Sequence, residues 1–213
     1  KELKWRIVFL RPLGLRLMLK YMGNVTLALA LQCFVIYQVL LFVFTRLNPI
    51  KFVKKFLPVM GFAFSTATSN ATIPMSIDTL NKKMGVSKQI SSFTIPLGAT
   101  INMDGTSIMQ GVAVIFIAEA YGIHLTPANL ATVVVTATLA SIGTAGIPSV
   151  GLVTLAMVLN SVGLPTEGIA LIMGIDRILD MLRTAVNITG DAVCTTIVSH
   201  QEKALNREVF NRN

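Results

Sequence analysis

The sequence predicts an all-α membrane protein in which a re-entrant helical hairpin and a broken or transmembrane helix occur twice, as an inverted repeat. The chain is 53% hydrophobic and only 13% charged, whereas soluble domains carry about 25% charged residues. Its uncharged runs are too long for soluble strands or core helices, and small polar residues interrupt several of them. A soluble α/β enzyme with buried strands is the alternative that this composition disfavours.

The net charge of +8 would indicate a nucleic-acid partner only if the basic residues formed one face. They instead gather between apolar segments, which is typical of loops held on the cytoplasmic side of a membrane. The two groups are Lys51, Lys54 and Lys55, and Lys82, Lys83 and Lys88. We therefore expect a lipid bilayer, and no nucleic acid, as the partner of this chain.

The first predicted helix covers residues 21–47, because residues 21–45 are an uncharged run long enough to span a bilayer with some tilt. Residues 1–20 are a basic segment of uncertain placement. They hold six of the 18 basic residues, yet a single span after them would place them outside, against the positive-inside bias. Our hypothesis is that they are a cytoplasmic loop and helix start from earlier in a parent protein, with the intervening residues absent.

The second element, at residues 52–80, is predicted to be a re-entrant hairpin. Residues 56–77 are uncharged, but their centre, "STATSNATIP", is poor material for a continuous helix. Each half has about ten residues and is roughly 15 Å long, half of a hydrocarbon core of about 30 Å. Both flanks are basic, so the segment would enter and leave on the same side.

A helix at residues 88–119 follows, and we expect Pro96, Gly98 and "NMDG" to break it near the midplane. The last helix is predicted at residues 168–199. A polar cytoplasmic tail, residues 201–213, returns the chain to the basic side.

A second hairpin is predicted at residues 125–166. Residues 120–166 contain no formal charge, and their centre reads "SIGTAGIPSVG". The loops around Glu119 and Glu167 contain no Lys or Arg, which places them outside. Hairpin and broken helix thus occur twice in opposite orientations, with "ATIP" matched by "AGIP". Such inverted repeats place substrate and ion sites near the membrane midplane.

The last helix carries one polar stripe, formed by Asp176, Asp180, Arg183, Asn187 and Asp191. At about 100° per residue, these positions fall within roughly 80° of arc. One interpretation is an internal ladder of ion pairs that neutralises itself. The other is a ligand site, because charges at membrane depth are costly and usually mark a pathway. In that case Arg183 would clamp a carboxylate and Asp180 would accept an ammonium group.

Asp104 lies in a stretch with no other charge between Lys88 and Glu119. A small hard cation would keep it ionised, because such cations prefer oxygen ligands and "NMDGT" offers amide, carboxylate and hydroxyl oxygens. Asn187 and Asp191 offer the same groups on the facing helix. The absence of a Cys/His cluster disfavours a transition metal. The alternative for Asp104 is an N-cap of the second half-helix.

Four motifs resemble one known family. They are "TSNATIP", "PLGATINMDGT", "ASIGTAGIP" and "DRILDMLRTAVNITGD", and their order and spacing cover about residues 21–200. In this respect the chain resembles the glutamate and neutral amino acid transporters, the dicarboxylate/amino acid:cation symporters.

The resemblance implies that residues 21–200 are part of an elevator-type transport domain whose hairpins act as gates, hairpin 2 on the extracellular side. It implies a multi-pass protein of the cell inner (plasma) membrane and a homotrimer formed through scaffold helices absent from this chain. The implied function is not enzymatic. It is symport of an acidic amino acid, aspartate or glutamate, with sodium ions. Cystine, neutral amino acids and C4-dicarboxylates stay open as substrates, and a channel or an intramembrane aspartyl enzyme are remote alternatives.

The resemblance also implies a substrate site. Its residues are Ser69, Thr106, Ile147, Asp180, Arg183, Thr184 and Asn187. Ser69 and the backbone of hairpin 1 would hold the main carboxylate, joined by Thr106 and the backbone near Ile147. Asp180 would bind the amino group and Arg183 the side-chain carboxylate. Thr184 and Asn187 would assist.

The implied sodium ligands lie at Gly98, Thr100, Asn102, Met103, Asp104, Ser141, Thr144, Asn187 and Asp191. One ion would use the side chains of Asn102 and Asp191 with the carbonyls of Gly98 and Asn187. A second would lie beside Met103, among the carbonyls of Thr100, Ser141 and Thr144. A third would use Asn102 and Asp104, completed by an earlier helix.

The chain departs from the family pattern at the tip of hairpin 1. The tip reads "TATSNAT" where a serine-rich sequence is usual, and some members have an arginine at the position of Ala67. Arg177 on the last helix is a candidate to supply that charge. The alternative is an ion pair between Arg177 and Asp176.

Overall fold

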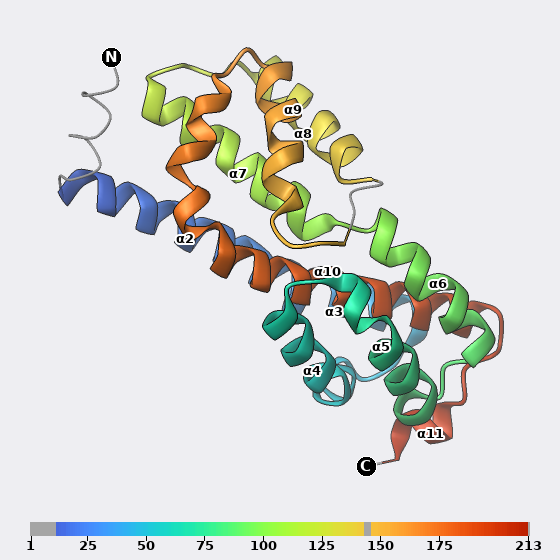
Figure 1. The fold of residues 1–213 in the computed structure, drawn as a ribbon. Helices are drawn as coiled ribbons and strands as arrows, with labels where there is room; N and C mark the ends of the chain where they lie inside the picture. The colour runs from blue at the N-terminus through green and yellow to red at the C-terminus, as the bar shows by residue number, and fades with distance from the viewer. Residues whose placement is uncertain (1–11, 143–145, 213) are drawn as a thin grey trace.

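The computed structural model describes residues 12–142 and 146–212, with side chains from residue 16 onward. The described residues form helices and no strand (Figure 1), which confirms the all-α prediction. In chain order the elements are α2 (Pro12–Leu31), the π-helical turn η1 (Gln32–Ile36), α3 (Tyr37–Thr45), α4 (Pro49–Thr66), α5 (Ser69–Met84), α6 (Lys88–Ile101), α7 (Asp104–Tyr121), α8 (Pro127–Ser141), α9 (Val150–Ser161), the 3-10 helix η2 (Thr166–Leu171), α10 (Met173–Gln201) and α11 (Arg207–Asn211).

The central element is α10, which packs against α2, α3, α4, α5, α6 and α7. In Figure 1 it runs beside α2 and α3 through the middle of the molecule. Because neighbours surround it, most of its residues from Leu179 to Ser199 are buried, polar ones included. Gly190 allows one close approach, since a Cβ at this position would lie 2.5 Å from the Tyr37 hydroxyl.

The first helix begins earlier than the predicted residue 21. α2, η1 and α3 follow one another without a break from residue 12 to residue 45. Proline is well tolerated in the first turn of a helix, and the residues that follow Pro12 are mostly good helix formers. The helix therefore extends past the apolar run, and Lys20 within it places its Nζ 3.8 Å from Oε2 of Glu119.

α4 and α5 form a helix pair joined only by Ala67 and Thr68, which we call the first tip. Asn48 caps α4 by accepting hydrogen bonds from two backbone amides, and Pro49 occupies the first turn. α4 ends at Ala67, whose backbone is left-handed with φ 50°. Pro74 lies inside α5 and does not end it.

The open end of this pair is the basic end of the molecule. Nζ of Lys55 donates to the carbonyls of Lys83 and Phe210, both at 2.8 Å. The amide of Asn206 donates to the carbonyl of Gly85 at 2.8 Å. The start of α4 and the end of α5 therefore lie together against the C-terminal segment.

The helix predicted at residues 88–119 is divided into α6 and α7, and its break is narrower than predicted. α6 continues through Pro96 and Gly98 to Ile101, and only Asn102 and Met103 separate it from α7. The expectation that Pro96 and Gly98 would help to break the helix was therefore wrong. A proline removes one intrahelical hydrogen bond, and packing against α5 and α10 outweighs that loss. At the break, Asn102 has φ −103° and ψ 85°.

α8 and α9 form a second helix pair, joined by residues 142–149, of which 143–145 lie outside the described residues. We call the described residues from Gly146 to Ser149 the second tip. α8 and α9 pack mainly against one another, α7 and η2. In Figure 1 the two helix pairs lie toward opposite ends of the molecule.

Two helical stretches of the described chain are long and apolar enough to cross a membrane, judged by length and composition. They are Arg16–Thr45 and Lys88–Tyr121.

The contact between α5 and the C-terminal segment predicts the effect of one glycine substitution. At Gly85 (φ +70°) a Cβ would lie 2.2 Å from the carbonyl oxygen of Asn206, whereas Gly122 (φ +69°) has nothing within 4 Å of its Cβ position. Gly85→Ala should therefore destabilise the fold by about 2–4 kcal/mol, from left-handed strain and overpacking. Gly122→Ala, which carries the strain alone, should cost about 1–2 kcal/mol.

Thermal unfolding of the two variants in detergent tests this difference. Equal melting temperatures would mean that the C-terminal segment does not pack on α5 as described.

Candidate functional site

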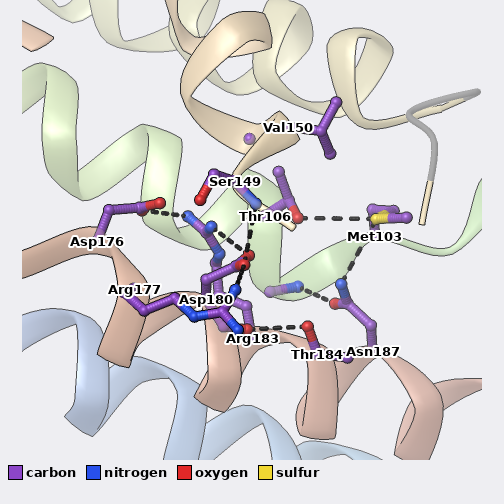
Figure 2. A network of polar contacts seen from close by, with 12 residues as sticks. Met103, Thr106, Ser149, Val150, Asp176, Arg177, Asp180, Arg183, Thr184 and Asn187 are labelled. Atoms are coloured by element: carbon purple, nitrogen blue, oxygen red, sulfur yellow. Dashed lines mark hydrogen bonds and ion pairs between the residues drawn. The ribbon is translucent and has the colours of Figure 1, made fainter. Parts of the chain in front are cut away.

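The two tips meet beside the middle of α10. Oγ1 of Thr68 in the first tip donates a hydrogen bond of 2.5 Å to the carbonyl of Gly146 in the second. Each tip has one non-glycine residue in the left-handed region, Ala67 with φ 50° and Ser149 with φ 60°. Figure 2 shows the second tip above the polar stripe of α10, with the start of α7 between them.

A small cavity of about 10 Å³, room for roughly one water, lies between these elements. Its lining residues are Ala67, Ser69, Met103, Thr106, Gly146, Ile147, Val150, Gly151, Asp180, Arg183, Thr184 and Asn187. All seven residues predicted for the substrate site are among them. The structure therefore brings this predicted set together, from both tips, α7 and α10.

Arg183 forms two ion pairs with other residues of α10. It is 1% exposed. Its Nη2 lies 2.7 Å from Oδ1 of Asp180, and its Nη1 lies 3.1 Å from Oδ1 of Asp176 (Figure 2). These are the internal ion pairs that the sequence left open as one interpretation of the stripe. The pairing is incomplete, because Nε of Arg183 and Oδ2 of Asp176 have no hydrogen-bond partner among the described residues.

Asp180 connects α10 with the second tip. The amide of Ser149 donates to its Oδ2 at 2.9 Å. Nη1 of Arg177 lies 3.9 Å from the same oxygen, and the Arg177 side chain is 55% exposed. Among the described residues, Arg177 thus pairs with Asp180, and no ion pair joins it to Asp176.

Asn187 connects α10 with the start of α7. Its Oδ1 accepts a hydrogen bond of 2.8 Å from the amide of Gly105. Its Nδ2 lies 3.6 Å from Sδ of Met103, and Oγ1 of Thr106 donates to the same sulfur at 3.8 Å. Nearer to Asp180, Oγ1 of Thr184 donates to that residue's carbonyl at 2.9 Å.

Three of the predicted cation ligands lie around the carboxylate of Asp191. Nδ2 of Asn102 donates to Oδ1 of Asp191 at 2.8 Å. A Cβ at Gly98 would lie 2.5 Å from the same oxygen, so the α6 backbone passes directly over this carboxylate. The structure thus brings together Gly98, Asn102 and Asp191, as predicted.

Asp104 begins α7 but is not its N-cap. Met103 occupies the cap position, and Asp104 lies in the first turn. The alternative role of Asp104 as an N-cap was therefore wrong. Its Oδ2 instead accepts hydrogen bonds from the Tyr37 hydroxyl at 2.9 Å and from Nε2 of Gln32 at 3.2 Å.

The other predicted cation ligands are less clearly assembled. Oγ1 of Thr100 donates to the carbonyl of Pro96, and Oγ of Ser141 donates to that of Thr138. Among the described residues, no hydrogen bond joins Thr100 to Ser141. Thr144 lies outside the described residues.

The charges along α10 are unevenly compensated. Asp176 and Asp180 share Arg183, whereas neither Asp104 nor Asp191 forms an ion pair within the described part of the chain. That part also contains no cluster of three His, Cys, Asp or Glu residues suited to a metal. A cation here would depend on one or two carboxylates together with carbonyl, amide and hydroxyl oxygens.

The sequence did not identify Gln32 and Tyr37 as residues of this region. Both lie in an uncharged apolar run, and they are five positions apart, so an α-helix would point them about 140° apart. The π-helical turn between them is not visible in the sequence pattern.

The comparisons with known proteins identify the family of this chain. The model of the sodium:dicarboxylate symporter family matches residues 10–201. The chain is 43% identical over 189 residues to an "Excitatory amino acid transporter" of Caenorhabditis elegans. The matched region covers 89% of this chain and 38% of that protein. It is also 42% identical over 197 residues to "Excitatory amino acid transporter 2" of Homo sapiens. This second matched region covers 92% of this chain and 33% of that protein. The chain thus spans about a third to two fifths of the length of these relatives. It belongs to the sodium:dicarboxylate symporter family.

Proposed function

We propose that this chain is part of a sodium-coupled symporter for an acidic amino acid, aspartate or glutamate. The observation that carries the proposal is the buried pair of Arg183 and Asp180 at the point where both tips, α7 and α10 meet. The names of the transporters to which it is similar also support it.

The substrate chemistry follows from the charges of the cavity. An acidic amino acid carries one ammonium group and two carboxylates. Asp180 accepts the ammonium group, and the planar guanidinium of Arg183 binds the side-chain carboxylate through paired hydrogen bonds. Ser69, Thr106 and the backbone near Ile147 hold the main carboxylate, and Thr184 and Asn187 assist.

The two charges together distinguish the candidate substrates. A neutral amino acid would leave the buried guanidinium without a ligand carboxylate, and a C4-dicarboxylate would leave Asp180 without an ammonium group. Either mismatch is costly, because the ligand then lacks charge-assisted hydrogen bonds that contribute about 1.5–3 kcal/mol each. Cystine, which carries both kinds of group, is the alternative closest to these requirements.

Binding requires the tips to separate. The cavity of about 10 Å³ is far below the roughly 300 Å³ or more of a small-molecule pocket. The ligand's ammonium group replaces the Ser149 amide on Asp180, and its carboxylate replaces Asp176 on Arg183. We infer that the second helix pair is the extracellular gate of an elevator-type alternating-access cycle.

Sodium supplies the positive charge that is lacking near Asp191 on α10 and near Asp104 on α7. We assign one ion to Gly98, Asn102, Asn187 and Asp191, and one to Asn102 and Asp104. A third, beside Met103, would use the carbonyls of Thr100, Ser141 and Thr144. Met103 lies between the two ion-binding residues Asn102 and Asp104 in the chain, and its sulfur contacts Thr106 and Asn187 at the cavity. Ion binding at the break therefore orders the substrate site, which is the differential stabilisation that coupling requires.

The membrane placement follows from the basic end. Lys51, Lys55 and Lys83 lie there, with the start of α4, the end of α5 and the C-terminal segment. We assign this end to the cytoplasmic side, which makes α4 and α5 a re-entrant pair and the tail cytoplasmic. The second pair then re-enters from the outside. The whole protein is a multi-pass protein of the inner (plasma) membrane that forms a homotrimer through helices outside this chain.

Removal of the guanidinium should abolish recognition of the acidic side chain. In the double variant Asp176→Asn, Arg183→Gln, one positive and one negative charge are lost together, so the net charge of the buried cluster is unchanged. The KM for aspartate should rise about 100-fold, since charge-assisted paired hydrogen bonds contribute about 2–4 kcal/mol. Uptake of radiolabelled aspartate into liposomes that contain the complete protein measures this change.

The exposed pair Asp78 and Lys82 provides the matched control. Asp78→Asn, Lys82→Gln also removes one charge of each sign, and uptake should stay at the wild-type level. Wild-type affinity for aspartate in the Arg183 variant would refute the assignment.

The first sodium site predicts a sodium-specific defect. Asp191→Asn should raise the half-saturating sodium concentration for uptake about tenfold or more, because it removes the ligand's charge. The KM for aspartate at saturating sodium should change much less. A sodium titration of uptake with choline as the replacement cation checks this, and an unchanged sodium requirement would argue against a role for Asp191.

A further inference from the structure

The first turns of α4 carry an exposed face on which one lysine lies between two apolar side chains. Ile50, Lys54 and Leu57 are spaced by four and three residues, so they lie on the same face of the helix. Ile50 is 66% exposed and Leu57 is 57% exposed, and Lys54 is exposed as well. The face therefore presents an apolar, a cationic and an apolar group along about 10 Å of helix.

Lys54 differs from the two other lysines of α4, because it does not hold the fold together. Nζ of Lys55 donates to the carbonyl of Phe210 at 2.8 Å, and Nζ of Lys51 donates to that of Asn211 at 3.2 Å. Within the described part of the chain, the side chain of Lys54 has neither an ion pair nor a hydrogen bond. Its ammonium group is therefore available to an anion from outside the chain.

Positive charge dominates this end of the molecule. Residues 46–55, 78–88 and 200–212 together hold ten Lys and Arg side chains and three Asp and Glu side chains. The amide of Asn206 donates to the carbonyl of Gly85 at 2.8 Å, and α11 lies beside the end of α5 (Figure 1), so these segments meet. Such an excess of positive charge attracts a negatively charged partner.

The apolar side chains determine which class of anionic partner fits. A nucleic acid or an acidic peptide would satisfy Lys54 and would leave Ile50 and Leu57 without apolar contacts. A phospholipid offers a phosphate to the lysine and acyl chains to its apolar neighbours. Gly61 continues the same face one turn beyond Leu57, and nothing lies within 4 Å of its Cβ position. An acyl chain can therefore lie along this part of α4.

We propose that the exposed face of Ile50, Lys54 and Leu57 binds an anionic phospholipid of the cytoplasmic leaflet, with the headgroup phosphate on Lys54. This inference rests on the proposed membrane placement, in which the basic end is cytoplasmic. Arg212 is exposed and follows Asn211, whose carbonyl binds Lys51. It supplies a second cation near the start of α4. The lipid anchors the open end of the first helix pair at the membrane surface.

Thermal unfolding of the complete protein in neutral detergent tests the proposal. The protein is titrated with phosphatidylglycerol and, separately, with phosphatidylcholine of the same acyl chains, and only phosphatidylglycerol should raise the melting temperature markedly. Lys54→Gln should weaken phosphatidylglycerol binding about fivefold, the effect of one basic side chain near an anionic headgroup. Lys54→Arg, which keeps the charge, should bind as the wild type does.

Lys20→Gln is the matched control. Lys20 is also an exposed helical lysine, and the substitution removes the same charge. It lies beside Glu119 on α2, a helix that begins far from α11 (Figure 1). This variant should keep the wild-type affinity for phosphatidylglycerol. An equal loss in Lys20→Gln and Lys54→Gln would show an effect of net charge alone and would overturn the inference.

Two further results would also overturn it. One is equal stabilisation by the two lipids, or an unchanged phosphatidylglycerol affinity in Lys54→Gln. The other is stabilisation by soluble glycerol phosphate or polyglutamate as strong as that by phosphatidylglycerol, because the site would then recognise a soluble anion. The titration requires neither sodium nor aspartate. Sodium-dependent aspartate uptake into liposomes is measured separately, so a failure of the symporter proposal is distinguishable from a failure of the lipid site.

Discussion

The structure depends on how a buried guanidinium is accommodated. Arg183 is 1% exposed, and a charge in that position costs several kcal/mol unless it is paired and hydrogen-bonded. Asp176 and Asp180 lie two turns and one turn earlier on the same helix, so α10 itself supplies the partners. Both tips and α7 pack around the cluster. Because Nε of Arg183 and one oxygen of Asp176 lack partners among the described residues, these pairs are weaker than a fully satisfied network. A ligand carboxylate can therefore compete with them.

The same helix is electrostatically different further along. Asp191 forms no ion pair within the described part of the chain, and the same holds for Asp104 on the facing α7. Asn187 lies between the two regions on α10, bonded to the amide of Gly105. A cation near Asp104 and Asp191 would stabilise the start of α7, and the start of α7 carries Thr106 into the cavity of the proposed substrate site. Under the proposed function, α10 thus connects the region where Asp176 and Asp180 are paired with Arg183 to the region where Asp191 is unpaired, and it offers a physical route from ion to substrate.

The sequence predicted those features that depend on composition and helical spacing. The stripe on α10 follows directly from its spacing, and the seven residues predicted for the substrate site line one cavity. Features that depend on a balance between local backbone preferences and tertiary packing could not be predicted. Pro96 was expected to interrupt its helix, yet packing holds α6 together as far as Ile101. The partnership of Gln32 and Tyr37 with Asp104 depends on a π turn, and a pattern based on 3.6 residues per turn assigns those side chains to different faces.

The two helix pairs are unequally supported, and under the proposed gating this difference favours opening of the second tip. α4 and α5 pack against α10, α6 and α11, and Lys55 fixes their open end to the C-terminal segment. α8 and α9 pack mainly on α7 and η2. The second tip is held to the rest of the site by single hydrogen bonds, from Thr68 to Gly146 and from Ser149 to Asp180. Each such bond contributes about 1 kcal/mol, or up to about 3 when one partner is charged. Separation of the second tip therefore breaks a few polar contacts, whereas movement of the first pair would expose part of the core around α10.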